Sequence, residues 1–209
     1  MWSKWVLGID VSTSHIGFCL LRKWKYGGDE PKVEYTKDLE LPKYSIDWVD
    51  KEIVLSNMKD VVEEIFHKIW IHTDVNETTY VNIIVELANF SNPKITQRFA
   101  EYTGMLVALI YSWPKYPAGK YFSRIVKLKY AAANDWFKEF AKEFGFTNWA
   151  QWPRTRRKEV SIKHFPKDVK VEKLTDNITD AYWLAKYFDN IGVDNEPKPI
   201  KNNKRRNSK

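Results

Sequence analysis

The sequence predicts an α/β protein with a five-stranded mixed sheet, in which an antiparallel meander comes first, parallel strands follow, and helices flank the sheet. Three apolar runs of strand length occupy the first forty residues with no helical pattern between them. Strands joined so closely have to pair antiparallel. Beyond residue 47, apolar patterns of helix length and strand length alternate, which is typical of parallel strands joined by crossover helices.

The first three strands are predicted at residues 4–11, 16–24 and 32–39. The polar turn Ser-Thr-Ser joins the first two, and the loop YGGDEP precedes the third. Gly8 and Gly17 lie inside the first two strands and permit another backbone to approach closely.

The remaining elements follow from apolar spacing and from stop signals. Apolar residues recur every three or four positions in the first predicted helix, and VNIIVE is a β-branched run typical of a strand buried on both faces. The segment WPKYPAG ends the second helix, Gly145 ends the third, and a Thr175/Asp176 cap begins the last. The predicted helices cover residues 47–70, 96–111, 131–144, 155–164 and 175–187, and the fourth and fifth strands cover residues 81–86 and 121–128.

The composition indicates one domain without a membrane span. The 209 residues are 44% hydrophobic, which suits a single core, predicted here over residues 1–194. The basic tail, residues 195–209, has almost nothing to bury and is predicted to be disordered. The lone cysteine, Cys19, lies in the apolar run IGFCLL and excludes an internal disulfide. No apolar run reaches the roughly 18 residues of a membrane span, and the amino terminus lacks a cleavage site, so we expect a cytoplasmic protein.

Charge is unevenly distributed along the chain. The net charge is +7, yet residues 115–173 hold 15 Lys and Arg against 6 Asp and Glu. Within this block Arg154, Arg156, Arg157 and Lys158 fall in five positions. A basic block of this density next to acidic segments predicts contact with a nucleic acid.

Three carboxylates lie where apolar segments begin or end: Asp10, Glu86 and Asp180. If the first and fourth strands are neighbours, these acids converge, and convergent carboxylates repel one another unless a divalent cation neutralises them. Asp176 and Asn177 share a helical face with Asp180, and Asp176 is either a ligand or a helix cap. Oxygen ligands without a Cys/His cluster favour Mg²⁺ or Mn²⁺ over zinc. Two such ions about 4 Å apart can cleave a phosphodiester.

These motifs resemble a known family. GIDVSTSHIGFCLL, IIVELANF, QRFAEYTGMLVALI and DNITDAYWLA are similar to the first hairpin, the fourth strand, the following helix and the closing helix of RuvC-type Holliday junction resolvases, especially phage-type members, within the ribonuclease H-like superfamily. The resemblance covers about residues 5–188. It implies a ribonuclease H-like fold and a Mg²⁺-dependent endodeoxyribonuclease for crossover junctions that leaves a 5′-phosphate and a 3′-hydroxyl.

The resemblance also implies roles for particular residues. Asp10, Glu86 and Asp180 match metal ligands of the family, and together with Asp176 they are the expected catalytic residues. The family has Asp or His where this chain has Asn177, so either the Asn177 amide oxygen or the neighbouring Asp176 supplies the further ligand. Phe90 lies one position later than the aromatic residue that stacks near the junction centre in the family, and a core role is equally open. The expected nucleic-acid contacts in the basic block are Lys127, Lys129, Arg154, Arg156, Arg157 and Lys158.

The expected partners are branched DNA and a second copy of the chain, because a two-fold symmetric dimer would present one site to each of two opposed strands. Either helix 47–70 or helix 96–111 is available for that interface. A phage-type protein would act in the cytoplasm of the host cell. Two other readings stay open: a nuclease of this fold acting on flaps or RNA–DNA hybrids, and a nucleic-acid-binding module without catalysis. Actin-like sugar kinases share the opening motif, but this chain lacks their second domain.

Overall fold

The computed structural model describes residues 3–24, 30–42, 48–73, 79–87, 92–113, 124–132 and 134–194. Phe90 and the tail 195–209 lie outside the described residues, so the predictions made for them stay predictions. Within the described ranges, no helix combines the length and the apolar character that a membrane span requires.

A single mixed sheet forms the centre of the molecule, with strand order β3-β2-β1-β4-β5-β6. The first three strands form the predicted antiparallel meander, and β4 and β5 continue parallel to β1. The neighbouring positions of the first and fourth strands are thereby confirmed. The strands are β1 Ser3–Val11, β2 His15–Trp24, β3 Lys32–Glu40, β4 Thr79–Leu87, β5 Arg124–Ala132 and β6 Val193–Asp194.

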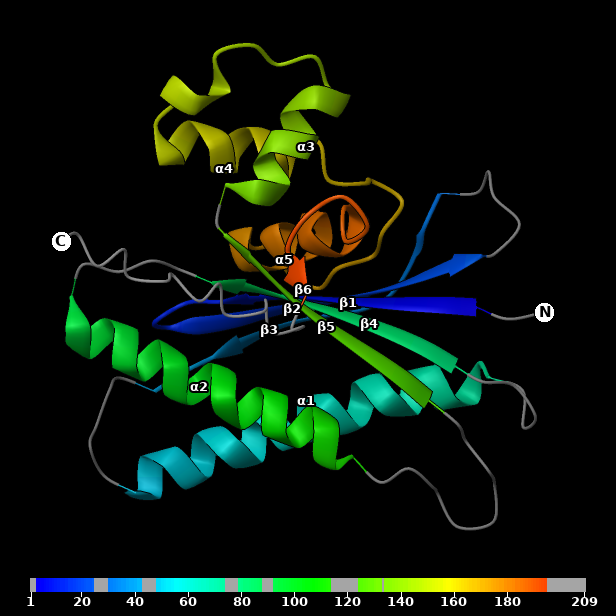
Figure 1. The fold of residues 1–209 in the computed structure, drawn as a ribbon, viewed down its shortest axis with the longest axis vertical. Coiled ribbons are helices and arrows are strands. Elements are labelled where there is room, and N and C mark those ends of the chain that lie inside the picture. Colours follow the sequence, from blue (N-terminus) through cyan, green and yellow to red (C-terminus); the bar gives the residue numbers. More distant parts are fainter. Residues whose placement is uncertain are drawn as a thin grey trace, which may run out of the picture.

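Helices cover both faces of the sheet (Figure 1). The long helices α1 and α2 lie on one face, and α5 lies on the other with α3 and α4 above it. The helices are α1 Trp48–Ile71, α2 Pro93–Ser112, α3 Asp135–Glu143, the short 3-10 helix η1 Trp149–Gln151, α4 Arg154–Lys163 and α5 Asp176–Lys186.

Two apolar cores result, one on each face of the sheet. Alternation along β1 sends Leu7 towards α1 and α2, whereas Val6 faces α5. The core on the α5 side is rich in aromatic rings, among them Phe137, Phe140 and Trp183. Cys19 is buried in the same core, where burial raises the pKa of its thiol.

The boundary between the fifth strand and the next helix differs most from the sequence prediction. The fifth strand was expected at residues 121–128 and the next helix from residue 131, but β5 runs to Ala132 and α3 begins at Asp135. An alanine run has high helix propensity, yet Ala131 and Ala132 pair with Glu86 and Leu87 of β4, and this pairing decides their conformation. The short sixth strand, β6, pairs with β5 through two residues and was not predicted.

Candidate metal centre

Asp10 and Glu86 lie next to each other at one end of the sheet. Ile9 pairs with Val85 in the parallel register of β1 and β4, and the two acids are the next residues of their strands. Because side chains alternate along a strand, both acids share the face on which Ile84 joins the core beneath α5. The sequence prediction that these two residues converge is therefore confirmed.

Helix α5 brings Asp180 to the same point because two glycines let the helix lie directly on the strands. A Cβ atom on Gly8 would be 1.9 Å from the carbonyl oxygen of Ala181, and one on Gly17 would be 2.2 Å from that of Asn177. Any side chain at either glycine would push the helix away. Asp180 directly precedes Ala181 and lines the same pocket as Asp10 and Glu86.

The three carboxylates are buried and poorly paired. Asp10 and Glu86 are 6% exposed and Asp180 is 7% exposed. The Oδ1 atom of Asp180 is buried without a hydrogen-bond partner among the described residues. Glu86 accepts a hydrogen bond of 3.1 Å from the indole nitrogen of Trp136. An unpaired buried carboxylate destabilises the folded protein, so a bound cation would stabilise this pocket.

The pKa values of all three acids are raised, which also indicates that their ionised forms are destabilised in this pocket. Burial raises the pKa of Asp10, and the negative charges of Glu86 and Asp180 raise it further. Burial likewise raises the pKa of Asp180, with Glu86 as the next cause. The pKa of Glu86 is also raised by burial, although the hydrogen bond from Trp136 opposes this shift. A divalent cation would relieve both the burial penalty and the mutual repulsion.

The donor set fits a hard cation such as Mg²⁺ or Mn²⁺, because every candidate ligand atom is an oxygen. In the described ranges, no three Asp, Glu, His or Cys side chains already stand close enough together to hold a metal ion. The pocket has a volume of about 720 Å³.

Asp176 and Asn177 lie at the start of α5, where they also line the pocket. The side chain of Thr175 caps the helix by accepting from the backbone N–H of Ile178 at 3.3 Å. Asp176 instead forms an ion pair with Lys158. Burial raises the pKa of Asp176, but the hydrogen bond and charge of Lys158 outweigh it, and the pKa lies below its usual range.

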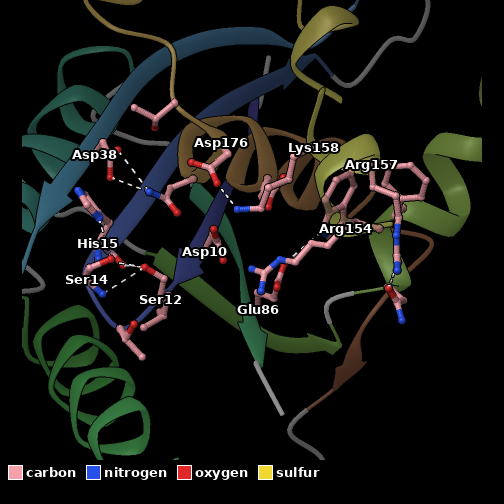
Figure 2. A pocket seen from close by; sticks show the side chains of 18 residues that line it. Asp10, Ser12, Ser14, His15, Asp38, Glu86, Arg154, Arg157, Lys158 and Asp176 are labelled. Carbon is pink, nitrogen blue, oxygen red and sulfur yellow. Dashed lines mark hydrogen bonds and ion pairs between the residues drawn. The ribbon is translucent and has the colours of Figure 1, made fainter. Parts of the chain in front are cut away.

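Asn177 donates from its amide nitrogen to both carboxylate oxygens of Asp38 on β3, at 3.3 and 3.4 Å. Figure 2 shows Asp38 and His15 at one side of the pocket, Arg154, Arg157 and Lys158 at the other, and Asp10 and Glu86 between them.

The basic wall of the pocket comes from one face of α4. Arg157 and Lys158 follow Arg154 by three and four positions, which places both beside it on one side of the helix, and all three line the pocket. Arg157 is held by hydrogen bonds to the side chain of Asn134 and to the carbonyl oxygen of Trp152. Arg156 points elsewhere, and its guanidinium lies 4.3 Å from the ring centroid of Trp152.

The other two predicted basic contacts lie away from the pocket. Lys129 donates to the carbonyl oxygens of Phe188 and Ile191 at 3.1 and 3.3 Å, so its ammonium group stabilises the turn that follows α5. Lys127 is exposed on β5, four residues before the strand position that pairs with Glu86. Neither lysine lines the pocket.

Sequence reasoning missed two residues at the site. Trp136 is an aromatic residue of the apolar core, 4% exposed, and its indole nitrogen also donates to Glu86. Asp38 lies in an alternating strand and carried no signal. Each contacts its partner across 50 residues or more of sequence, and no spacing pattern reports such a contact.

Comparisons with known proteins show which folds this chain resembles. No protein-family model matches the chain. The uncharacterized protein UU157 of Ureaplasma parvum serovar 3 is 33% identical over 108 residues, which are 52% of this chain and 41% of that protein. The match therefore spans less than half of that relative's length.

Solved structures extend the likeness to most of the chain. RuvC of T. thermophilus in complex with a Holliday junction substrate is 11% identical, with a TM-score of 0.55 over 88% of this chain and 91% of that one. A second Thermus thermophilus RuvC structure is 12% identical, with a TM-score of 0.53 over 88% of this chain and 95% of that one. The chain therefore has the ribonuclease H-like fold of RuvC, as the sequence motifs predicted.

Proposed function

We propose that this chain is a divalent-metal-dependent endonuclease that resolves four-way DNA junctions. The observation that carries the proposal is the meeting of three buried, poorly paired carboxylates from β1, β4 and α5 in one pocket with a basic wall on α4. A polyanion would be repelled by the acids alone and attracted by α4, so a cation has to mediate between them. The fold shared with RuvC, which binds a Holliday junction in one solved structure, supports branched DNA as the substrate.

In this proposal Asp10, Glu86 and Asp180 hold the cation, Mg²⁺ or Mn²⁺, and Asn177 or Asp176 adds an oxygen. A pair of such ions, when bound, supplies an activated water and stabilises the departing oxygen of a phosphodiester. The residues of the chain set the geometry around that chemistry, and Trp136 fixes the carboxylate of Glu86 by its hydrogen bond.

The basic residues of α4 would bind the substrate and offset charge on the scissile phosphate. Arg154 and Lys158 interact electrostatically with Glu86 and Asp180, which places cationic groups next to the acids. Cations fixed beside a reacting phosphate lower the energy of the charge that develops on its oxygens. Arg157, held by Asn134, would contact a neighbouring phosphate.

We also propose that two copies act together on one junction in the cytoplasm. Helix α1 exposes Ile53, Leu55 and Ile71, which are 50%, 39% and 49% exposed, and α2 exposes Tyr111 at 50%. Both helices lie on the face opposite α5 (Figure 1), so a dimer formed through them would leave the acidic pocket accessible. Light scattering in solution should give twice the 24.8 kDa of one chain.

The experiment that tests the function compares nicking of four-way, flap, linear duplex and RNA–DNA hybrid substrates with Mg²⁺. We expect the four-way junction to be cleaved fastest. Asp10→Asn should abolish cleavage while binding persists, because the basic wall is intact. Glu30→Gln, an exposed acid just before β3 and at the end of that strand away from the pocket, is the matched control and should cleave normally.

The other outcomes assign the other functions. Preferred cleavage of flaps or hybrids would keep the metal chemistry and change the substrate. Binding without cleavage under any divalent metal would identify a non-catalytic module. Cleavage that survives Asp10→Asn would refute the proposed centre.

A further inference from the structure

The two candidates for the further metal ligand are in different states. Asp176 is bound to Lys158 in an ion pair, so part of its charge is already neutralised. Among the residues that the structure describes, the Asn177 side chain has no cationic partner; its amide nitrogen is bound instead to Asp38. The contact with Asp38 therefore bears on how the Asn177 amide is oriented.

The architecture places Asp38 and Asn177 together through a glycine. Asp38 of β3 pairs with Gly17 of β2, and a Cβ on Gly17 would lie 2.8 Å from the Cβ of Asn177. The missing side chain at Gly17 leaves room for Asn177 to descend beside Asp38. The position of Asn177 is thus set by backbone packing, and only the rotation of its amide remains to be fixed.

An ionised carboxylate fixes that rotation, because it only accepts hydrogen bonds. The NH₂ group of Asn177 has to face Asp38, and the amide oxygen Oδ1 has to face the other way. Asn177 lines the pocket together with Asp10 and Asp180, so Oδ1 is left to the pocket.

We propose that Asp38 is a positioning residue of the metal centre, which orients the Asn177 amide so that its oxygen serves as the further ligand. This inference rests on the proposed function. Partners of this kind, which bind a ligand rather than the metal, change metal affinity about 10- to 100-fold when they are removed.

The test measures binding of Mn²⁺ alone to the full chain, by electron paramagnetic resonance of the free ion and without nucleic acid. Asp38→Asn should weaken binding about tenfold, because an amide at residue 38 lets Asn177 turn either way. Glu40→Gln, which removes an exposed negative charge from the same strand, controls for charge alone and should change affinity less than about twofold.

A second background separates orientation from charge. Asn177→Asp replaces the amide with a carboxylate, whose two oxygens are equivalent and need no orienting. In that background Asp38→Asn should no longer weaken Mn²⁺ binding. An equal loss in both backgrounds, or no loss in either, would overturn the inference.

The failure of the proposed function looks different. Asp10→Asn should abolish Mn²⁺ binding if the metal centre is where we place it. Loss of binding in Asp10→Asn together with normal binding in Asp38→Asn would refute the role of Asp38 alone. Normal binding in Asp10→Asn would refute the centre itself, and the role of Asp38 with it.

Discussion

Trp136 is the residue that most directly controls the chemistry of a buried acid. Its ring is packed against Phe137 and Phe140 at centroid distances of 5.3 and 6.3 Å, and its indole N–H donates to Glu86. The rigid ring thus gives a buried carboxylate a fixed orientation. It also stabilises the ionised form, which is the form that can bind a metal.

We expect Trp136→Phe to weaken metal binding while the fold persists. Phenylalanine keeps most of the apolar contact but has no donor, so the pKa of Glu86 should rise further and protons should compete better with the metal. A reduction in Mn²⁺ affinity of about tenfold is expected, with a loss in unfolding free energy of about 1 kcal/mol. Calorimetric titration of Mn²⁺ measures the first and urea unfolding the second.

Trp183→Phe is the matched control for that substitution. The indole of Trp183 is also buried and donates at 3.4 Å to the backbone carbonyl oxygen of Ser161 rather than to a carboxylate. It should cost similar stability and leave Mn²⁺ affinity unchanged. If both variants lost metal affinity alike, general loosening of the core would explain the result and the role of Trp136 would be refuted.

At the scale of elements, the seating of α5 on β1 and β2 decides whether the acids meet. The helix presents Ala181 and Ala185 to Gly8, so small residues on both sides let the two backbones touch. This contact carries Asp180 to the end of β1. The same helix delivers Asn177 to Asp38 on β3.

Gly8→Ala should therefore destabilise the fold and the metal centre together. A methyl group cannot fit 1.9 Å from the Ala181 carbonyl oxygen, so α5 has to move. We expect a loss of about 2 kcal/mol or more in urea unfolding, together with weaker Mn²⁺ binding.

Gly104→Ala on α2 gives the opposite control. A Cβ there meets nothing within 4 Å, and alanine is favoured over glycine inside a helix by about 1 kcal/mol. That variant should be as stable as the natural chain or more so. Equal stability of the Gly8 and Gly104 variants would contradict the close seating of α5.

Helix α4 is the element that should bind the substrate. Arg154→Gln removes a cation that lines the pocket, and we expect junction affinity to fall about fivefold and the slope of log affinity against log salt to fall by about one. Fluorescence anisotropy at several salt concentrations measures both.

Arg156→Gln offers a comparison on the same helix. Its guanidinium lies over the Trp152 ring outside the pocket, so its effect should be smaller than that of Arg154→Gln. A larger effect at Arg156 would move the proposed binding face to the other side of α4.

Some elements and contacts were predictable from the sequence, and others were not. Strands β1, β2 and β4 and the convergence of Asp10 and Glu86 were predictable, because apolar alternation and strand ends are local signals. The predicted end of β5 was wrong, because pairing of the alanine run with Glu86 and Leu87 overrode its helix propensity. Asp38 and the donor role of Trp136 were out of reach, because both depend on contacts between elements distant in sequence.

At the scale of the whole molecule, the buried carboxylates that the proposed cation site requires lower the stability of the metal-free fold. Two apolar cores hold the sheet between helices, and this burial, about 25 cal/mol for each Å² of apolar surface, stabilises the fold that forces three carboxylates together. In the proposed function, the carboxylates that hold the cation destabilise the cation-free protein. The dependence of stability on pH should expose that conflict.

The stability of the metal-free chain should depend on pH through its buried acids. The pKa values of Asp10, Glu86 and Asp180 are raised in the folded state, whereas in the unfolded chain they return to about 4. A raised carboxyl pKa means that the folded state holds protons that the unfolded state has released. The contribution of these acids to stability is therefore present at low pH and is lost as pH rises above about 4 through the raised values.

Asp176, Glu143 and Asp189 have lowered pKa values and act in the opposite direction: their contribution is present above about pH 4 and is lost below it. The comparison of the natural chain with Asp10→Asn cancels these groups. In EDTA at about pH 8, Asp10→Asn should be more stable by about 1 kcal/mol, which is about 2–4 °C in Tm for a chain of this size. At about pH 5 the difference should shrink, because Asp10 is then more protonated.

Adding Mg²⁺ should reverse the order at about pH 8, since the cation binds only the folded natural chain and displaces the protons that oppose it. Thermal unfolding with EDTA or Mg²⁺ at both pH values measures all of these differences, with Glu30→Gln as the control for loss of one surface charge. If Asp10→Asn gave no gain in EDTA, Asp10 would not be under electrostatic stress. If Mg²⁺ stabilised both chains equally, the ion would bind elsewhere, and the pocket would have to be explained without a metal.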